Sequence, residues 1–337
     1  MEIKLHRDFS EIGQSQWDAL LSHSVTDIPF LKYGYLSHWW QYRGGGEWPQ
    51  DAQLYILSGW DNGKLKGIAP LFSIQEDGQE KVYLLGSIEI SDYLDFIASS
   101  DDLEDFIKSS LGYLSNYTDR AISSLTLVNI PGQSPTNSLL EKFAPEFGWS
   151  VKVENAYHTP AILLASDWDS YLASIDKKQR HEIRRKLRRA DESAEVKWYF
   201  ANDPETLDAE INAFIDLMTL DKDKNRFLTS RMRDQMRAII HWAFEAGYLQ
   251  LSFLTIESFK AAGYLCFDYN GHILVYNSGF DYRFSQYSPG WVLLGYLIQN
   301  AIESRKKSFD FMRGDEDYKY RFGAADGFVT RVELKKA

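Results

Sequence analysis

Apolar residues recur at helical spacing in both halves of the chain, and they predict where its helices lie. In each such segment, positions three and four residues apart are apolar and fall on one face, as in an amphipathic helix. In the first half the pattern predicts helices over residues 17–21, 35–40 and 103–117, and one that ends near Phe143. In the second half it predicts helices over residues 168–175, with Asp167 as the N-cap, and over residues 207–218, 232–243 and 291–304.

Short apolar runs alternate with these helices and predict strands. They lie at residues 53–58, 64–74, 81–86, 93–98 and 124–130, and again at residues 249–256, 261–269, 272–280, 308–312 and 328–334. Asp61-Asn62-Gly63 and Asn270-Gly271 are typical of hairpin turns and connect neighbouring strands.

The two halves of the chain share one order of elements: helices, an antiparallel meander, a helix and a strand. We therefore expect an α/β (α+β) protein with two tandem domains, each a mixed, largely antiparallel sheet flanked by helices. The boundary is expected near residues 150–160, which gives domains of residues 1–155 and 156–337. No residue-level repeat of about 20–50 residues occurs, so solenoids and propellers are excluded.

The composition is that of an ordinary globular protein, with 44% hydrophobic and 25% charged residues. Cys266 is the only cysteine among 337 residues, so no intrachain disulfide can form and a reducing compartment is the default. No segment approaches about 18 uncharged apolar residues, and the first residues lack the apolar core of a signal peptide. These features predict a cytoplasmic protein without a membrane span.

The net charge of −11 is distributed unevenly. Residues 1–150 hold 10 Lys and Arg against 21 Asp and Glu, whereas residues 151–337 hold 27 of each. Within the second half, residues 177–189 carry eight Lys or Arg against one Glu, in a segment expected to continue the helix that begins after Asp167. The overall sign disfavours DNA and general nucleic-acid binding. The basic segment is either a solvated face or a contact surface for phosphates of a cofactor, an RNA or a nucleotide-linked substrate.

Ser288-Pro289-Gly290 opens the helix predicted over residues 291–304 and is the first candidate binding site. Ser288 suits the N-cap, Pro289 suits the first helical position, and Gly290 lets a ligand approach the backbone. Free amides at a helix N-terminus suit a pyrophosphate, although an ordinary helix cap is the alternative. Because such a terminus supplies about 0.3–2 kcal/mol and micromolar binding needs about 8 kcal/mol, Arg283 or other donors must contribute.

Residues 309–323 form the second candidate site, in which a short strand leads into Arg313-Gly314 and an acidic cluster. Asp315 could accept a proton from an amine, and Tyr318 could return one to a leaving thiolate. An amine with a pKa of about 10.4 is mostly protonated at pH 7, so presenting it neutral costs about 4–5 kcal/mol and a carboxylate base is useful. A solvated charged turn is the alternative interpretation.

Other kinds of site lack support in the sequence. Cys266 lies inside an apolar strand, which favours a core residue over a nucleophile. The seven His residues show no metal-ligand spacing, and no P-loop, GxGxxG or GxSxG motif occurs. We therefore expect no metal and no covalent intermediate.

Three segments, taken together and in order, resemble the bacterial GNAT-fold acetyltransferases of the FemAB/CelD-like type. They are the basic stretch from Lys177 to Leu187, residues 276–281 with Ser288-Pro289-Gly290, and residues 309–323 with Phe309-Asp310-Phe311, Arg313-Gly314-Asp315-Glu316 and Tyr318-Lys319. The resemblance covers about residues 168–323. It implies two GNAT-like domains and direct transfer of an acyl group from acetyl-CoA or another acyl-CoA, as co-substrate, to an amine.

The resemblance also implies roles for single residues. Cofactor binding is expected of Arg283, Tyr287, Ser288, Pro289 and Gly290; substrate and proton handling of Asp315, Tyr318 and Lys319; and substrate contact of Asp281, Arg313 and Arg184. The acceptor amine would belong to a sugar, a peptide or a small molecule, in cell-envelope or polysaccharide metabolism.

Two alternatives remain open at this point. FemAB relatives use aminoacyl-tRNA as the donor, and the basic segment could then grip tRNA phosphates. The chain lacks the long inserted coiled-coil arm that many tRNA-dependent relatives carry. The second alternative is a non-catalytic binding protein that keeps the fold.

Overall fold

The computed structural model describes residues 1–116, 122–193 and 195–336. The chain divides into two compact units, one of Met1–Tyr157 with Phe328–Ala337 and one of His158–Gly327. The last strand therefore belongs to the first unit, whereas the sequence division placed it in the second. Its pairing explains the difference, because β16 (Phe328–Lys336) runs antiparallel to β8 (Ile122–Pro131) from Val329 opposite Pro131 to Lys335 opposite Ser124.

The first unit contains two sheets. The four-stranded sheet has the order β1 (Glu2–His6), β3 (Ile56–Asp61), β4 (Lys64–Ala69) and β7 (Ile97–Ala98). The six-stranded sheet has the order β2 (Gln53–Leu54), β5 (Leu71–Glu76), β6 (Gln79–Leu84), β8, β16 and β9 (Trp149–His158). The α-helices are α1 (Gln14–Leu21), α2 (Tyr33–Gly46), α3 (Leu103–Asn116) and α4 (Pro135–Phe143), and the 3-10 turns are η1 (Phe9–Glu11), η2 (Pro29–Leu31) and η3 (Ala144–Phe147).

The second unit is built on one six-stranded sheet. Its order is β10 (Ala161–Leu163), β15 (Ser308–Asp310), β14 (His272–Phe280), β13 (Phe259–Tyr269), β12 (Leu249–Ile256) and β11 (Val196–Phe200). The helices are α5 (Trp168–Ser174), α6 (Lys177–Ser193), α7 (Leu207–Thr219), α8 (Lys222–Phe227), α9 (Ser230–Glu245), α10 (Pro289–Glu303) and α11 (Asp317–Arg321), with the 3-10 turn η4 (Tyr282–Tyr287) before α10. The fold is thus mixed α/β, with sheets flanked by helices, as expected.

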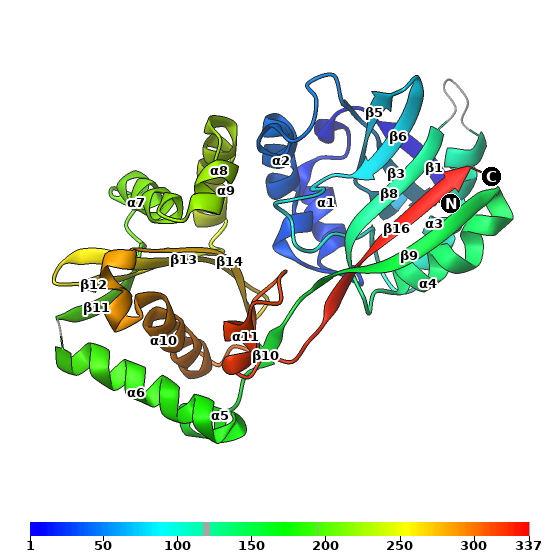
Figure 1. The fold of residues 1–337 in the computed structure, drawn as a ribbon. Coiled ribbons are helices and arrows are strands. Elements are labelled where there is room, and N and C mark those ends of the chain that lie inside the picture. The colour runs from blue at the N-terminus through cyan, green and yellow to red at the C-terminus, as the bar shows by residue number, and fades with distance from the viewer. Residues whose placement is uncertain (117–121, 194, 337) are drawn as a thin grey trace. The chain divides into compact units, whose positions relative to one another are not determined.

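Helix α10 is the central helix of the second unit. It packs on β13 and β14 on one side and on α6 on the other, while α7 and α9 lie across the opposite face of the sheet (Figure 1). Most of its side chains are apolar and buried, among them Val292, Leu293, Leu294, Leu297 and Ile298. Each such burial contributes about 1.5–3 kcal/mol, so the position of the α10 N-terminus is fixed by the core behind it.

The sequence suggested that the basic segment continues α5, but in the structure it forms a separate helix. Ile175 has an extended backbone with ψ 150°, and the chain restarts as α6 two residues later. The carboxylate of Asp176 accepts a hydrogen bond from the Lys178 amide at 2.8 Å and caps the new helix. Among its described residues, Ile183 and Ala190 are buried, so most of its cations face solvent, whereas the Lys186 ammonium lies over the Trp291 ring, 4.3 Å from its centroid.

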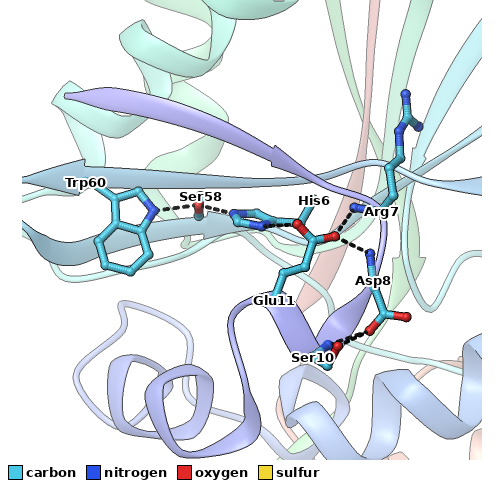
Figure 2. A network of polar contacts seen from close by, with 7 residues as sticks. All are labelled: His6, Arg7, Asp8, Ser10, Glu11, Ser58 and Trp60. Atoms are coloured by element: carbon cyan, nitrogen blue, oxygen red, sulfur yellow. Dashed lines mark hydrogen bonds and ion pairs between the residues drawn. The ribbon is translucent and has the colours of Figure 1, made fainter.

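A polar network joins β1, η1 and β3 in the first unit (Figure 2). His6 Nε2 lies 2.6 Å from Ser58 Oγ, and His6 Nδ1 lies 3.2 Å from Glu11 Oε2. Trp60 donates its indole hydrogen to Ser58 Oγ at 2.7 Å. The order serine, histidine, carboxylate matches a hydrolase triad. Ser58 is 0% exposed, so no acyl substrate can reach its hydroxyl and the network serves to join the elements.

Several elements differ from the sequence expectation. Only Ile97–Ala98 of the strand predicted over residues 93–98 is a strand, because Asp95 turns its carboxylate into a buried cluster of hydroxyls. Tyr117, the last residue of a predicted helix, lies outside the described residues. Among the described helices, none is long and apolar enough to cross a lipid bilayer.

Candidate functional site

Strands β14 and β15 are parallel neighbours of unequal length, and the split between them begins where β15 ends. They pair only from His272 opposite Ser308 to Leu274 opposite Asp310, and β14 then continues to Phe280. The register of β14 against β13 shifts at the same place, because Cys266 pairs with Val275 and Leu265 with Asn277. Tyr276 is therefore an extra residue, a β-bulge that re-aims the strand beyond it. The remainder of β14 keeps β13 on one edge and leaves a gap on the other.

A cavity of about 360 Å³ lies at this split. Its walls come from β13, β14, η4, the start of α10 and α11, and they consist of Tyr264, Ser278, Phe280, Tyr282, Ser285, Ser288, Pro289, Gly290, Trp291, Leu294 and Tyr318. Within the described part of the chain, no charged side chain lines it. Such walls favour an apolar ligand segment oriented by a few hydroxyl and backbone groups.

The N-terminus of α10 opens into this cavity through Ser288, Pro289 and Gly290. Ser288 has a left-handed backbone, with φ 53° and ψ 53°, and its side chain makes no capping hydrogen bond. The first intrahelical bond of α10 runs from the Val292 amide to the Ser288 carbonyl at 3.0 Å. The amides of Gly290 and Trp291 consequently have no intrahelical acceptor and are available to an anion.

Gly290 also keeps the cavity open. A Cβ atom at this position would lie 3.4 Å from Cδ1 of Phe280, on the opposite wall. The backbone can therefore approach a ligand closely, as the sequence suggested for this glycine.

Two tyrosine hydroxyls reach the cavity from different elements. Neither Tyr264, on β13, nor Tyr318, on α11, has a hydrogen-bond partner for its hydroxyl among the residues that the structure describes. Burial raises the pKa of both phenols, and for Tyr318 the negative charge of Glu316 adds to that effect. Both groups therefore stay protonated at neutral pH and can donate a hydrogen bond or a proton.

Lys319 and Asp315 lie outside the cavity walls. Lys319 is 2% exposed, and its ammonium donates to the carbonyls of Arg313 at 2.8 Å and Gly314 at 3.0 Å and pairs with Glu316 at 2.8 Å. All three of its donors are thus engaged in holding the loop that precedes α11. Asp315 is an exposed residue of that loop, and Arg313 contributes its carbonyl to Lys319.

Arg283, expected at the cofactor, is directed elsewhere. Its guanidinium makes a bidentate pair with Asp281, at 2.6 and 2.9 Å to Oδ2, and its side chain is 78% exposed. The Arg283 charge lowers the pKa of the Asp281 carboxyl, which also caps η4 by accepting from the Arg283 amide. Neither Arg283 nor Asp281 is part of the cavity wall. Tyr287 packs against the hydrophobic core of the second unit.

Arg184 lies on the exposed side of α6, with its guanidinium 3.5 Å from Asp169. Of the sequence-predicted residues, the structure thus brings Ser288, Pro289, Gly290 and Tyr318 together in one cavity. Arg184, Arg283, Asp281, Tyr287, Arg313, Asp315 and Lys319 are not among its lining residues.

The sequence analysis missed most of the aromatic wall. Residues 278, 280 and 282 occupy alternate positions after the bulge and all face the cavity, and this period of two was readable in the sequence. Tyr264 reaches the site only because it pairs with Ser278 across the sheet. No local signal marks it.

Comparisons with known proteins identify a domain in the second unit. Residues 177–320 match the family model "Acetyltransferase (GNAT) domain", which covers α6 through α11. No curated protein matches the chain at a significant level.

Solved structures resemble the whole chain at low sequence identity. FemX has a TM-score of 0.67 at 12% identity, covering 98% of this chain and 97% of FemX. L-PGS from Bacillus licheniformis has a TM-score of 0.57 at 11% identity, covering 96% and 92%. A tandem GNAT protein from the clavulanic acid biosynthesis pathway has a TM-score of 0.51 at 11% identity, covering 98% and 97%. Residues 177–320 therefore match a GNAT acetyltransferase domain, and the chain as a whole has the fold of FemX and of a tandem GNAT protein.

Proposed function

We propose that the protein transfers an acyl group from acyl-CoA directly to the amine of a sugar, peptide or small molecule. The observation that carries this proposal is the uncharged cavity at the β14–β15 split, which ends on the uncapped N-terminus of α10. A CoA thioester has the matching chemistry, with an uncharged arm and acyl group at one end and a diphosphate at the other. The single cysteine and the choice of CoA favour a cytoplasmic location.

The donor would be held by two kinds of contact. The amides of Gly290 and Trp291 would take the diphosphate, and the uncharged arm would run along the free edge of β14, as an added strand does. The helix terminus supplies only about 0.3–2 kcal/mol of the about 8 kcal/mol that micromolar binding requires. Burial of the apolar arm against Phe280, Trp291 and Leu294 must therefore supply most of the affinity.

The chemical step exchanges a carbon–sulfur bond for a carbon–nitrogen bond and needs two proton transfers, one from the amine nitrogen and one to the leaving thiolate. The amine nitrogen attacks the thioester carbonyl carbon, the carbon–sulfur bond breaks, and the leaving thiolate takes a proton. Tyr318 is the proposed proton donor, because its hydroxyl faces the cavity and its raised pKa keeps it protonated. The proton that the amine nitrogen loses passes to Asp315 and Glu316, the proposed acceptor beside the cavity, and Tyr318 regains its own proton from solvent.

The exposed cations of α6 favour one alternative donor, aminoacyl-tRNA. Arg184, Arg185, Arg188 and Arg189 face solvent on a helix that contributes few residues to the core. RNA bound there should dissociate steeply as salt rises, and Arg184→Glu should weaken it. Salt-independent or absent RNA binding removes this donor.

A donor screen tests the proposal. Wild-type protein is melted with acetyl-CoA, longer acyl-CoAs, free CoA and aminoacyl-tRNA, since a ligand at 100 times its Kd stabilises by about 2.7 kcal/mol. The stabilising donor is then incubated with a panel of amines, and release of free thiol is followed. Stabilisation by acyl-CoA followed by amine-dependent thiol release supports the proposal. Stabilisation without turnover on any amine indicates a binding protein.

A further inference from the structure

Helix α8 contributes no buried side chain to the core of the second unit, yet it is joined to the cavity wall by polar contacts. All six residues of Lys222–Phe227 are exposed or partly exposed. A short helix without apolar anchoring is held weakly. Side-chain hydrogen bonds join α8 to β14 and η4, and these bonds hold the helix in place of apolar packing.

The first of these bonds comes from Lys224. Its ammonium donates to Asn277 Oδ1 at 3.0 Å and, through a shorter bond, to the main-chain carbonyl of Ser278. Both acceptors lie on β14 just beyond the bulge, and Ser278 lines the cavity. The Asn277 oxygen also accepts the Ser278 amide at 2.9 Å, so Lys224 and Asn277 together fix the peptide units around Ser278.

Lys224 is an unusual lysine. Its side chain is partly exposed, yet burial of the ammonium lowers its pKa, an effect that the charges of Asp221 and Glu316 oppose. Among the described residues it forms no ion pair. Burying a cation without an anionic partner is costly. A lysine that serves only solubility would extend into water, so this position indicates a specific task for the ammonium group.

The second bond involves Asp221, the residue that caps α8. One carboxylate oxygen accepts the amides of Asp223 and Lys224, each at 3.0 Å. The other oxygen accepts the hydroxyl of Tyr282 at 3.2 Å. Tyr282 is a cavity residue at the start of η4. The Asp221 side chain therefore both caps α8 and binds a residue of the cavity wall.

We propose that Asp221 and Lys224 are positioning residues that clamp the outer wall of the cavity, from Ser278 to Tyr282, in place for acyl transfer. Beyond the split, β14 has a strand partner only on the β13 side, and its free edge otherwise lacks support. Asp221 and Lys224 supply that support, and neither is among the residues that line the cavity. This inference rests on the proposed function, because the wall it holds is the proposed donor site.

Two paired substitutions test the clamp. Lys224→Met removes the ammonium at similar side-chain length, and Lys222→Met removes an exposed lysine two residues earlier in the same helix as the matched control. Tyr282→Phe removes only the hydroxyl that Asp221 accepts. Hydrogen–deuterium exchange of residues 276–282 is measured first, since it reports the wall whether or not the protein is active.

Kinetics with the donor found in the screen then report the function. Because small misplacement of reacting groups costs up to about 100-fold in rate, we expect Lys224→Met to lower kcat about 10- to 100-fold. We expect Tyr282→Phe to lower it less, and Lys222→Met to change it less than about twofold. Lys224→Arg should restore part of the loss, since a guanidinium can donate to the same two acceptors.

The outcomes separate the clamp from the proposed function. Faster exchange at residues 276–282 in Lys224→Met, with wild-type exchange in Lys222→Met, supports the clamp even if no donor is ever found. Unchanged exchange and unchanged kcat in Lys224→Met overturn it. An equal loss of kcat and melting temperature in Lys224→Met and Lys222→Met also overturns it, because the effect would then come from α8 as a whole. A wild-type protein that binds no acyl donor overturns only the proposed function.

Discussion

Tyr264 and Ser278 lie directly opposite each other on β13 and β14, and both line the cavity. The bulge at Tyr276 creates this pair. If the register of Cys266 with Val275 continued without the extra residue, Asn277 would face Tyr264 instead. The bulge therefore brings Ser278 rather than Asn277 opposite the tyrosine, and leaves the Asn277 oxygen to accept Lys224.

The cavity stays uncharged although a highly charged loop lies beside it. Asp315, Glu316 and Asp317 lie in and after the loop that leads to α11, but only Tyr318 from this region enters the wall. The carboxylate of Glu316 pairs with the Lys319 ammonium and does not line the cavity. A thioester in the cavity would therefore meet hydroxyl and backbone donors, which suit a developing oxyanion and a leaving thiolate.

Tyr318→Phe should lower kcat about 100-fold or more, in the range typical of loss of a general acid, with a smaller effect on the donor KM. Burial raises the pKa of Tyr318, so the acid form persists as pH rises, and loss of this proton should not limit kcat below about pH 10. Steady-state kinetics from pH 6 to about 10 check both points.

The control for this variant is Tyr320→Phe, on the same short helix. The Tyr320 hydroxyl bonds to Asp326 at 3.1 Å and is exposed, so its removal should leave kcat within about twofold. Equal activity of Tyr318→Phe and wild type would remove Tyr318 from proton transfer. Tyr264→Phe then becomes the next variant to measure.

Gly290→Val should weaken donor binding more than it slows the chemical step. Even a Cβ atom here would lie 3.4 Å from Phe280, so a branched side chain would narrow the cavity beside the proposed diphosphate amides. We expect the donor Kd to rise about tenfold or more, equivalent to about 1.4 kcal/mol, as measured by calorimetry. The melting temperature without ligand should hold, because Gly290 is at an ordinary helical position. Unchanged donor affinity would place the diphosphate elsewhere.

The central elements of the second unit could be predicted because their patterns are strong. Strands β12, β13 and β14 and helix α10 carry long apolar runs, and Asn270-Gly271 marks the hairpin between two of the strands. The start of α10 at Ser288-Pro289-Gly290 could be predicted because cap chemistry is local to the sequence. Tyr318 was singled out as a possible proton donor from its residue type beside an acidic cluster.

The remainder of the site depends on tertiary contacts that no local pattern encodes. Helix α8 has no buried side chain, so its sequence carries no amphipathic signal, and Lys224 resembles any surface lysine until its bonds to β14 are seen. Arg283 was expected to bind phosphate because of its charge. It is instead paired with Asp281, two residues away, a competition that residue type alone does not reveal.

Lys319→Met should mainly destabilise the protein, rather than remove a catalytic group. The ammonium is buried and bonds to two carbonyls and a carboxylate, and hydrogen bonds to charged groups contribute about 1.5–3 kcal/mol each. We expect a loss of about 2–4 kcal/mol in the free energy of unfolding, as measured by urea denaturation. Arg321→Met, which removes an exposed cation paired with Asp317, is the control and should cost less than about 1 kcal/mol. A Lys319→Met protein of wild-type stability with abolished kcat would restore a chemical role to Lys319.

Asp95 should have the strongest effect on stability in the first unit. It is 0% exposed, and its carboxylate accepts the hydroxyls of Thr26, Ser134 and Thr136, each at 2.6 Å, and the Phe96 amide at 2.8 Å. Asp95→Ala leaves three buried hydroxyls without their acceptor and should cost about 3 kcal/mol or more. Asp95→Asn keeps the size and one acceptor oxygen, and the hydroxyls can rotate to accept from the new amide, so it should cost less.

The pH dependence of stability distinguishes the charged from the neutral form of Asp95. Burial raises the pKa of this carboxyl above its usual value, so the folded protein binds its proton more tightly than the unfolded chain does. The stabilisation from that proton is complete below the unfolded value and is lost as pH rises through the folded value. Wild type should therefore lose stability relative to Asp95→Asn over a range of pH that begins at about 4 and extends upward, as measured by urea denaturation of both proteins at each pH. If the difference stays constant across this range, or changes in the opposite direction, then the four hydrogen bonds outweigh burial and the carboxylate is charged throughout.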